Sequence, residues 1–294
     1  MKLLKKKFST DFYLGFAPFF WLILFYAVPS LLVFLLAFKP VDPYGGIGSG
    51  WTLATLEELF TVSSYPAILW RTLWMGVVST FVCIALAIPI SYQIARSSPR
   101  WKNVLLILIL VPFWTNFLIR IYAWKVFLHP EGFFKQLLVL IGLIQPENML
   151  LYNQYAVLTV MIYTYIPYAV LPIYAVAEKF DFSLLDAAKD LGASSFYAFR
   201  KVFLPSISQG IGTAVLVVLI PALGAYLIPS LVGGPGCELL GDKIAQRVFT
   251  DRNLPHASAL SAFLMLAVFI PLLAGVLFKK HWDRKMVKGG KKHE

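Results

Sequence analysis

Six long stretches without a charged residue dominate the sequence. Each contains between 17 and 36 residues. The stretches are Phe12–Phe38, Thr72–Ala95, Asn103–Ile119, Asn148–Ala177, Val202–Cys237 and Asn253–Phe278. A helix needs about 20 apolar residues to cross the hydrocarbon core of a bilayer, where an irregular chain would leave its backbone polar groups unpaired. The sequence therefore predicts an all-α integral membrane protein with six transmembrane helices.

The composition agrees with this interpretation. Hydrophobic residues make up 59% of the chain and charged residues only 14%, and the mean hydropathy is +0.73. Soluble proteins carry about 25% charged residues, which keep their surfaces hydrated. A largely lipid-facing surface is expected here, and a soluble enzyme, a secreted scaffold and a disordered chain are excluded.

Residues that could support catalysis or metal binding form no recognisable pattern. Cys83 and Cys237 are not in a C-x-x-C motif, and the sequence has no H-E-x-x-H and no G-x-x-x-x-G-K-[ST] motif. Each of the four histidines is expected to be solvated in a loop or in the tail: His129, His256, His281 and His293. We therefore predict a protein that is not an enzyme, with no catalytic residue, no metal and no cofactor. Any ATP hydrolysis that drives it should occur on a separate chain.

The distribution of Lys and Arg predicts the orientation. With the amino terminus inside the cell, 18 of the 26 Lys and Arg residues lie on the cytoplasmic side. Cytoplasmic segments of membrane proteins carry an excess of these residues, so both termini are predicted to be cytoplasmic. Attraction to anionic membrane lipid explains the formal net charge of +11, and nucleic acid is not expected as a partner.

The chain is predicted to have three parts. Residues 1–65 should form a transmembrane helix and a polar external loop, since the first apolar stretch is too long for a cleaved signal sequence. Residues 66–280 should form a five-helix membrane domain, and residues 281–294 a basic cytoplasmic tail. A further apolar run, Gln136–Pro146, has 11 residues. It is too short to span a bilayer and is interpreted as an interfacial or re-entrant helix.

The longest internal loop, Glu178–Leu204, lies between the fourth and fifth stretches. Ser183 and Asp186 have the spacing of a capping box, which predicts that a short helix begins there. Apolar residues follow at helical spacing, and Gly192 can adopt the left-handed conformation that ends a helix. A second short helix is expected from about Ser194. Such a hairpin could rest on the membrane or lie in a groove of another protein, and periodicity alone favours neither alternative.

The same loop resembles the signature of a known family. Asp186-Ala187-Ala188, followed by Gly192 and then by Leu204-Pro205, is similar to the E-A-A, G, L-P signature of type I ABC-importer permeases, with Asp in place of Glu. The resemblance implies a type I ABC importer permease fold. It also implies that the loop is a coupling helix, which seats in a cleft of a cytoplasmic ABC ATPase dimer.

Three further stretches resemble the spermidine/putrescine permeases of this family. They are residues 112–124, 220–229 and 231–235, and the whole resemblance covers about residues 12–280. It implies one half of a translocation pathway for polyamines in the bacterial plasma (inner) membrane. The implied partners are a second homologous permease subunit, an extracytoplasmic polyamine-binding protein and membrane lipid. Many relatives carry an acidic residue where Ala225 stands, so this chain is not expected to supply a carboxylate to a cationic cargo.

Two alternatives stay open. One is a permease of the same class for another small solute, such as ferric iron, because the composition contains nothing that demands a polyamine. The other is a channel or scaffold protein whose internal loop binds a partner that is not an ATPase. A secondary transporter is disfavoured, since such proteins usually carry buried acidic residues and the six stretches have none.

Helix-breaking and aromatic residues are the candidates for the cargo pathway. Broken helices inside a membrane are tolerated where they face protein or a water-filled cavity, and aromatic faces attract cations. Kinks without cargo contact and anchoring at the lipid headgroups are the alternatives. Arg120 is the only charge near the interior of a span and is expected to reach the membrane surface. The candidate pathway residues are Trp114, Tyr122, Pro221, Gly224, Tyr226 and Pro229.

Overall fold

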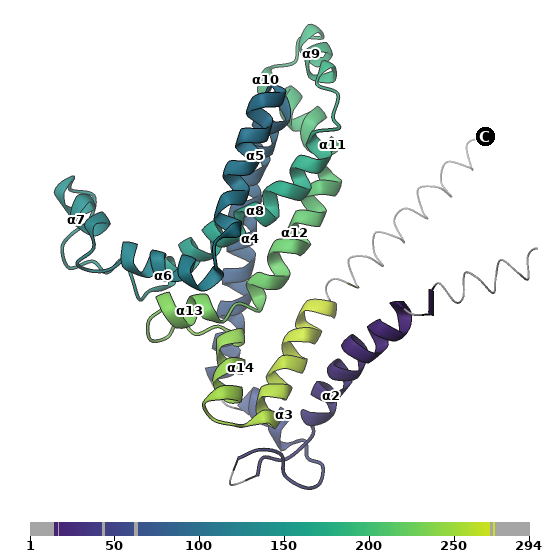
Figure 1. Ribbon diagram of the computed structural model, residues 1–294, viewed down its shortest axis with the longest axis vertical. Coiled ribbons are helices and arrows are strands. Elements are labelled where there is room, and N and C mark those ends of the chain that lie inside the picture. Colours follow the sequence, from purple (N-terminus) through teal and green to yellow (C-terminus); the bar gives the residue numbers. More distant parts are fainter. Residues whose placement is uncertain (1–14, 17, 43–44, 62–63, 271–272, 274–294) are drawn as a thin grey trace, which may run out of the picture. The chain divides into compact units, whose positions relative to one another are not determined.

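The computed structural model describes residues 15–16, 18–42, 45–61, 64–270 and 273, and this part of the chain is helical (Figure 1). The named helices are η1 (Ile23–Ala27), α2 (Val28–Leu36), α3 (Ala54–Thr61), α4 (Ser64–Arg96), α5 (Pro99–Trp114), α6 (Phe117–Phe127), α7 (Phe133–Leu140), α8 (Gln154–Ala177), α9 (Ser183–Asp190), α10 (Ser195–Ala198), η2 (Phe199–Phe203), α11 (Leu204–Ser206), α12 (Ser208–Leu223), α13 (Leu227–Val232) and α14 (Leu240–Phe249). The chain forms two compact units: Met1–Pro66 with Lys243–Glu294, and Ala67–Asp242.

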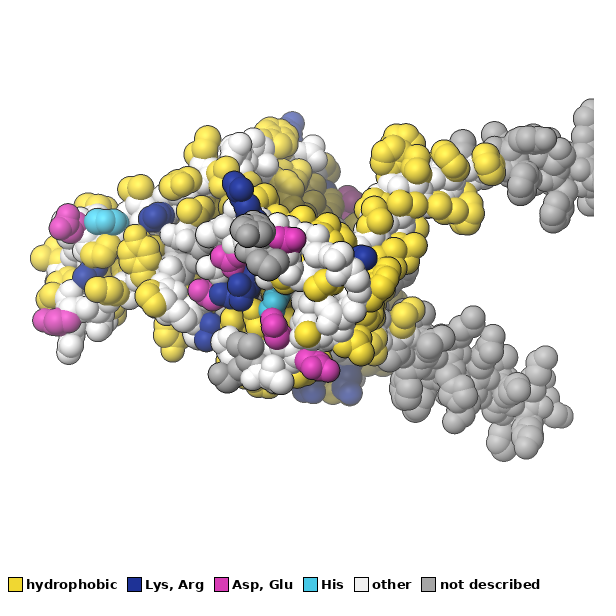
Figure 2. All heavy atoms as spheres, turned by 90° about the horizontal axis from the view of Figure 1, so that it is seen from below, with side chains coloured by type: hydrophobic (Ala, Val, Ile, Leu, Met, Phe, Trp, Pro, Cys, Tyr) yellow, Lys and Arg dark blue, Asp and Glu magenta, His cyan; other side chains and the backbone are white. Residues whose placement is uncertain are grey.

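Three described helices are long and apolar enough to cross a membrane as single segments: Pro18–Leu36, Ser64–Arg96 and Gln154–Ala177. Two bent pairs add one span each if each pair is counted together. The chain bends by 92° between α5 and α6. It bends by 67° between the helices Ser195–Ser206 and Ser208–Leu223. The sixth predicted span contains a shorter apolar helix, Leu254–Ile270, and the rest of that stretch lies almost entirely outside the described residues. Hydrophobic side chains are exposed over much of the surface, as expected of helices that face lipid (Figure 2).

The third predicted span, Asn103–Ile119, is wrong as a single helix, because a corner divides it. α5 ends just before Thr115, whose hydroxyl donates a 2.7 Å hydrogen bond to the carbonyl of Pro112. Asn116 begins α6, and its Oδ1 accepts hydrogen bonds from the backbone N–H groups two and three residues further on, at 2.9 and 3.4 Å. These bonds satisfy polar groups that the ends of the two helices would otherwise leave unpaired.

Two other predicted spans differ at their first residues. α4 begins at Ser64, before the predicted Thr72, and therefore includes Arg71. Arg71 can lie inside the helix because its Nη1 donates a 3.2 Å hydrogen bond to the carbonyl of Glu238. α8 begins after the predicted start, because the side chain of Asn153 accepts the backbone N–H three residues further on at 2.9 Å and caps the helix.

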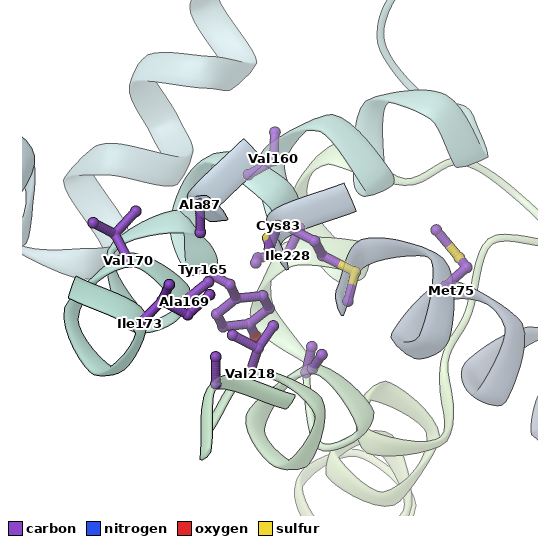
Figure 3. Packing of buried hydrophobic residues seen from close by; sticks show 14 of the residues in the cluster. Met75, Cys83, Ala87, Val160, Tyr165, Ala169, Val170, Ile173, Val218 and Ile228 are labelled. Carbon is purple, nitrogen blue, oxygen red and sulfur yellow. The ribbon is translucent and has the colours of Figure 1, made fainter. Parts of the chain in front are cut away.

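The core of Ala67–Asp242 lies where α4, α8, α12 and α13 meet (Figure 3). Polar side chains also join α4 to α8. The Cys83 thiol donates to the carbonyl of Ile162 at 3.5 Å, and the Ser91 hydroxyl donates to that of Val170 at 3.2 Å. In a membrane, where lipid is as apolar as the helices, such bonds and close packing hold helices together.

The unit that combines both ends of the chain differs from the sequence expectations in two ways. The segment predicted as a polar external loop contains the helix α3. The expectation that His256 is solvated is wrong, since this side chain is buried and its Nδ1 lies 3.3 Å from the Glu58 carboxylate of α3. The Tyr65 ring lies 5.2 Å from the His256 ring, and the Tyr65 hydroxyl accepts a hydrogen bond from Arg247. His129 is exposed as expected, and the other two histidines lie outside the described residues.

Candidate functional site: the helix hairpin and the broken spans

The internal loop forms the predicted pair of short helices. α9 begins at Ser183, as predicted. Gly192 follows it with a φ of +89°, in the left-handed region that favours glycine. Ser194 begins the second helix, and its hydroxyl oxygen accepts the backbone N–H of Tyr197 at 3.2 Å. Both helices and the turn at Gly192 are therefore confirmed.

The predicted capping box is wrong. The residue before α9 is Phe182, which makes no capping bond with its side chain. Instead the Asp181 carboxylate accepts the backbone N–H of Ser183 at 3.0 Å, and hydrogen bonds from Ser183 hold the pKa of that carboxyl below its ordinary value. Asp186 forms an exposed ion pair with Lys189 at 3.1 Å. Asp181 precedes Ser183 by two residues, and its carboxylate accepts the Ser183 N–H. The S-x-x-E pattern considers only its first and fourth residues, and the prediction therefore missed Asp181.

The tip of the hairpin exposes apolar side chains, although it lies outside the six uncharged stretches. Leu191 is 90% exposed and Phe196 is 73% exposed. Asp186 and Ala187 are exposed as well, whereas Leu204 and Pro205 lie further along the chain at the start of α11. The structure thus brings only Ala188 and Gly192, among the signature residues, into one open groove. The groove is lined by Ala188, Leu191, Gly192, Ala193, Ser194 and Tyr197.

A cluster of aromatic rings fixes the base of the hairpin to α4, and sequence reasoning missed it. We call it the aromatic anchor. Phe203 is fully buried, and its ring centroid lies 5.0 Å from that of Tyr92 in α4, 5.2 Å from that of Phe180 and 5.3 Å from that of Phe199. The anchor consists of Tyr92, Phe180, Phe182, Phe199 and Phe203. The sequence signal for this cluster was the repetition of Phe at both ends of the loop, at residues 180 and 182 and again at residues 199 and 203.

An ion pair also holds the entry to the hairpin. Glu178 follows the last residue of α8 and lies 3.1 Å from Lys102 of α5. A hydrogen bond with the Tyr174 hydroxyl, together with the charge and hydrogen bond of Lys102, keeps the pKa of Glu178 below its ordinary value. The carboxylate therefore stays charged at neutral pH, and α5 and α8 are tied together just before the hairpin begins.

The predicted break in the fifth span is confirmed. α12 continues through Pro221 and ends before Gly224, and the short helix α13 then begins at Leu227 and contains Pro229. The Pro221 carbonyl lies in the last turn of α12, and the Tyr165 hydroxyl of α8 donates a 3.2 Å hydrogen bond to it. This bond ties the end of α12, next to the break, to α8.

The structure brings three of the predicted pathway residues into one region. α6 packs against α13, which brings the helix of Tyr122 close to the segment that contains Tyr226 and Pro229. Trp114 stands at the corner where α5 ends. The side chains of the three aromatic candidates are accessible, with Trp114 exposed to 78%, Tyr122 to 51% and Tyr226 to 43%. Pro221 and Gly224 are exposed, whereas Pro229 is buried.

Apolar spans, two of them broken, and an internal helix hairpin define a multi-pass membrane protein. Residues 87–288 match the family described as binding-protein-dependent transport system inner membrane component, and the chain belongs to this family. The family consists of transport permease subunits of the inner membrane.

Individual relatives agree with this assignment. The chain is 35% identical to the spermidine/putrescine transport system permease protein PotB of Haemophilus influenzae over 261 residues, which cover 89% of this chain and 90% of that protein. It is 32% identical to PotB of Escherichia coli, over 86% of this chain and 92% of the relative. A solved bacterial ABC transporter that imports the acidic polysaccharide alginate has a similar chain, with a TM-score of 0.71, 18% identity and coverage of 95% and 99%. The predicted all-α type I ABC importer permease fold is confirmed.

Proposed function

We propose that this chain is the permease subunit of an ATP-driven importer and forms one half of a translocation pathway for polyamines. The names of the PotB relatives support the cargo. The absence of Asp and Glu from the six apolar stretches supports an energy source on another chain, since proton- and ion-coupled transporters rely on such residues.

The observation that carries this proposal is the exposed tip of the hairpin. Leu191 and Phe196 are apolar, lie outside the six uncharged stretches and are more than 70% exposed. Exposed apolar side chains around a groove are typical of a surface that another protein covers. We assign this surface to a cytoplasmic ABC ATPase dimer, with both termini of the chain on the same side of the membrane.

Two further partners belong to the proposal. One is a second homologous permease subunit, which supplies the other half of the pathway. The other is an extracytoplasmic binding protein that delivers the polyamine. A second solved alginate importer structure, in complex with its alginate-bound periplasmic protein, has a chain similar to this one at a TM-score of 0.70, and this similarity supports the same arrangement here.

Uptake measurements test the function. Membrane vesicles that contain this chain and its co-encoded partners should accumulate radiolabelled putrescine and spermidine when ATP is supplied on the cytoplasmic side. Uptake of ferric iron or of another small solute, without uptake of either polyamine, would favour the alternative cargo. Solute movement that is independent of ATP would favour the channel.

We further propose that the cargo passes along the break in the fifth span and the corner of the third, past Trp114 and Tyr226. Aromatic faces can hold an ammonium group at about 0.5–2 kcal/mol each without an acid in the membrane. Replacing either residue by Ala should therefore reduce polyamine uptake several-fold, and replacing it by Phe should restore most of it.

The control for this pathway prediction is Trp101→Ala, because Trp101 is also in α5 and is 65% exposed. It lies at the opposite end of the helix and should transport normally. Equal losses in the Ala and Phe variants of Trp114 would indicate hydrogen bonding or packing instead of stacking. Normal uptake in all variants would place the pathway along other spans.

A further inference from the structure

Arg120 lies beside the interior of α8, a helix that is long and apolar enough to cross a membrane. It lines a pocket together with Tyr163 of α8. Tyr163 lies about 14 Å from the Gln154 end of α8 and about 21 Å from the Ala177 end, at 1.5 Å per residue. The 92° bend before α6 turns this helix away from the axis of α5.

Two phenylalanine rings hold the guanidinium in place. Its central carbon lies 5.7 Å from the ring centroid of Phe113 and 5.8 Å from that of Phe117. Phe113 itself makes an edge-to-face contact with Tyr168 of α8, and the two ring centroids lie 4.7 Å apart. The Nε of Arg120 is buried and has no hydrogen-bond partner among the described residues. A cation in this position is costly unless an anion pairs with it.

The described part of this chain does not provide that anion. Its six apolar stretches contain no Asp or Glu, and within the described ranges no ion pair involves Arg120. Lipid phosphates lie at the bilayer surface, about 15 Å from the centre of the hydrocarbon, and do not reach this depth. A polyamine is a cation and would be repelled.

The surface around Arg120 is open to another protein. Ile119, Tyr122 and Val126 of α6 are 66%, 51% and 71% exposed. The pocket at Arg120 has a volume of about 280 Å³, which is sufficient for a carboxylate side chain. The pocket is lined by Arg120, Ala123, Trp124, Phe127 and Tyr163.

We propose that Arg120 pairs with an Asp or Glu side chain from a membrane helix of the second permease subunit. The ion pair joins the two subunits in the middle of the membrane, where the low dielectric makes a correctly placed countercharge selective for the right partner. This inference rests on the proposed function, since it requires a second permease.

The first test compares two charge-removing variants of the same helix. Arg120→Gln should reduce the amount of second permease that co-purifies with the tagged chain by about tenfold, because it leaves the partner's carboxylate buried and unpaired. Lys125→Gln is the matched control and should keep the wild-type amount, since Lys125 lies 5.9 Å from the Tyr152 ring and outside the pocket. A wild-type amount of partner with Arg120→Gln would overturn the proposal.

A charge exchange identifies the partner residue. In the Arg120→Glu background, each Asp and Glu in the membrane helices of the second permease is replaced by Arg in turn. One of these combinations should restore co-purification to within about twofold of wild type. Failure of every combination would overturn the ion pair.

Photo-crosslinking tests the same contact without disturbing Arg120. A photoreactive amino acid at Val126 should form an adduct with the second permease. An adduct with lipid alone would overturn the contact. Failure of the proposed function gives a different result: in that case the unmodified complex, with all partners present, would not show ATP-driven uptake of any tested solute.

Discussion

Gly192→Val is expected to abolish transport and cargo-stimulated ATP hydrolysis while the protein remains inserted in the membrane. Gly192 has a φ of +89°, and a Cβ placed there would meet no atom within 4 Å. The effect therefore arises from the backbone conformation, which a β-branched residue disfavours, and not from a clash. Distortion of this turn changes the angle between the two helices that we propose as the ATPase contact. The measurements are polyamine uptake, ATPase activity and co-purification of the ATPase.

Gly142→Val is the matched control for this experiment. Gly142 follows α7, has a φ of +72° and likewise has open space at its Cβ position. The substitution imposes the same kind of strain in another loop and should leave ATPase binding intact. Ala188→Glu, which places a charge in the groove, should act like Gly192→Val. If both hairpin variants co-purify with the ATPase and hydrolyse ATP normally, the hairpin has another role.

Gly210→Leu is expected to prevent stable folding of the chain. Gly210 lies in the first turn of α12, where a Cβ would be 2.8 Å from the carbonyl oxygen of Pro172 and 3.1 Å from the Cα of Ile173, both in α8. Backbone atoms cannot move aside cheaply, so the two helices would separate. We expect a loss of about 3 kcal/mol or more in stability, at the upper end of overpacking effects. Thermal unfolding in detergent and the yield of monodisperse protein measure it.

The same helix supplies the control for this prediction. Gly212 is two residues further along α12, and no atom lies within 4 Å of its Cβ position. Gly212→Leu adds the same side chain on an exposed position and should unfold at the wild-type temperature. If Gly210→Leu also unfolds at that temperature, α12 does not depend on this close approach to α8.

The sequence predicted the helical spans and the hairpin because both depend on local patterns. Stretches without charge locate most of the membrane helices, and the residues around Gly192 carry their own turn signal. The corner at Thr115 and Asn116 was missed, since the criterion was the absence of charge and both residues are uncharged. Both are residues that cap helices through their side chains, and this signal was available.

The other differences depend on partners that are distant in the sequence. Arg71 lies within α4 because it reaches a carbonyl 167 residues away. His256 is buried because α3 supplies Glu58. The aromatic anchor similarly joins Tyr92 to rings near residues 180 and 200. Single-sequence reasoning sees the residue types but not which ones meet, and therefore it assigned these side chains to solvent or did not consider them.

The aromatic anchor determines how a displacement of the hairpin would be transmitted to the membrane helices. Tightly interlocked rings do not compress; they move together or separate. Tyr92 lies near the end of α4, and Phe203 lies next to the bent start of the fifth span. A displacement of the hairpin tip would therefore move the end of α4 and the start of the fifth span together. The same α4 runs alongside α8, whose Tyr165 holds the break near Pro221. Packed rings and hydrogen bonds thus link the proposed ATPase contact to the break in the fifth span.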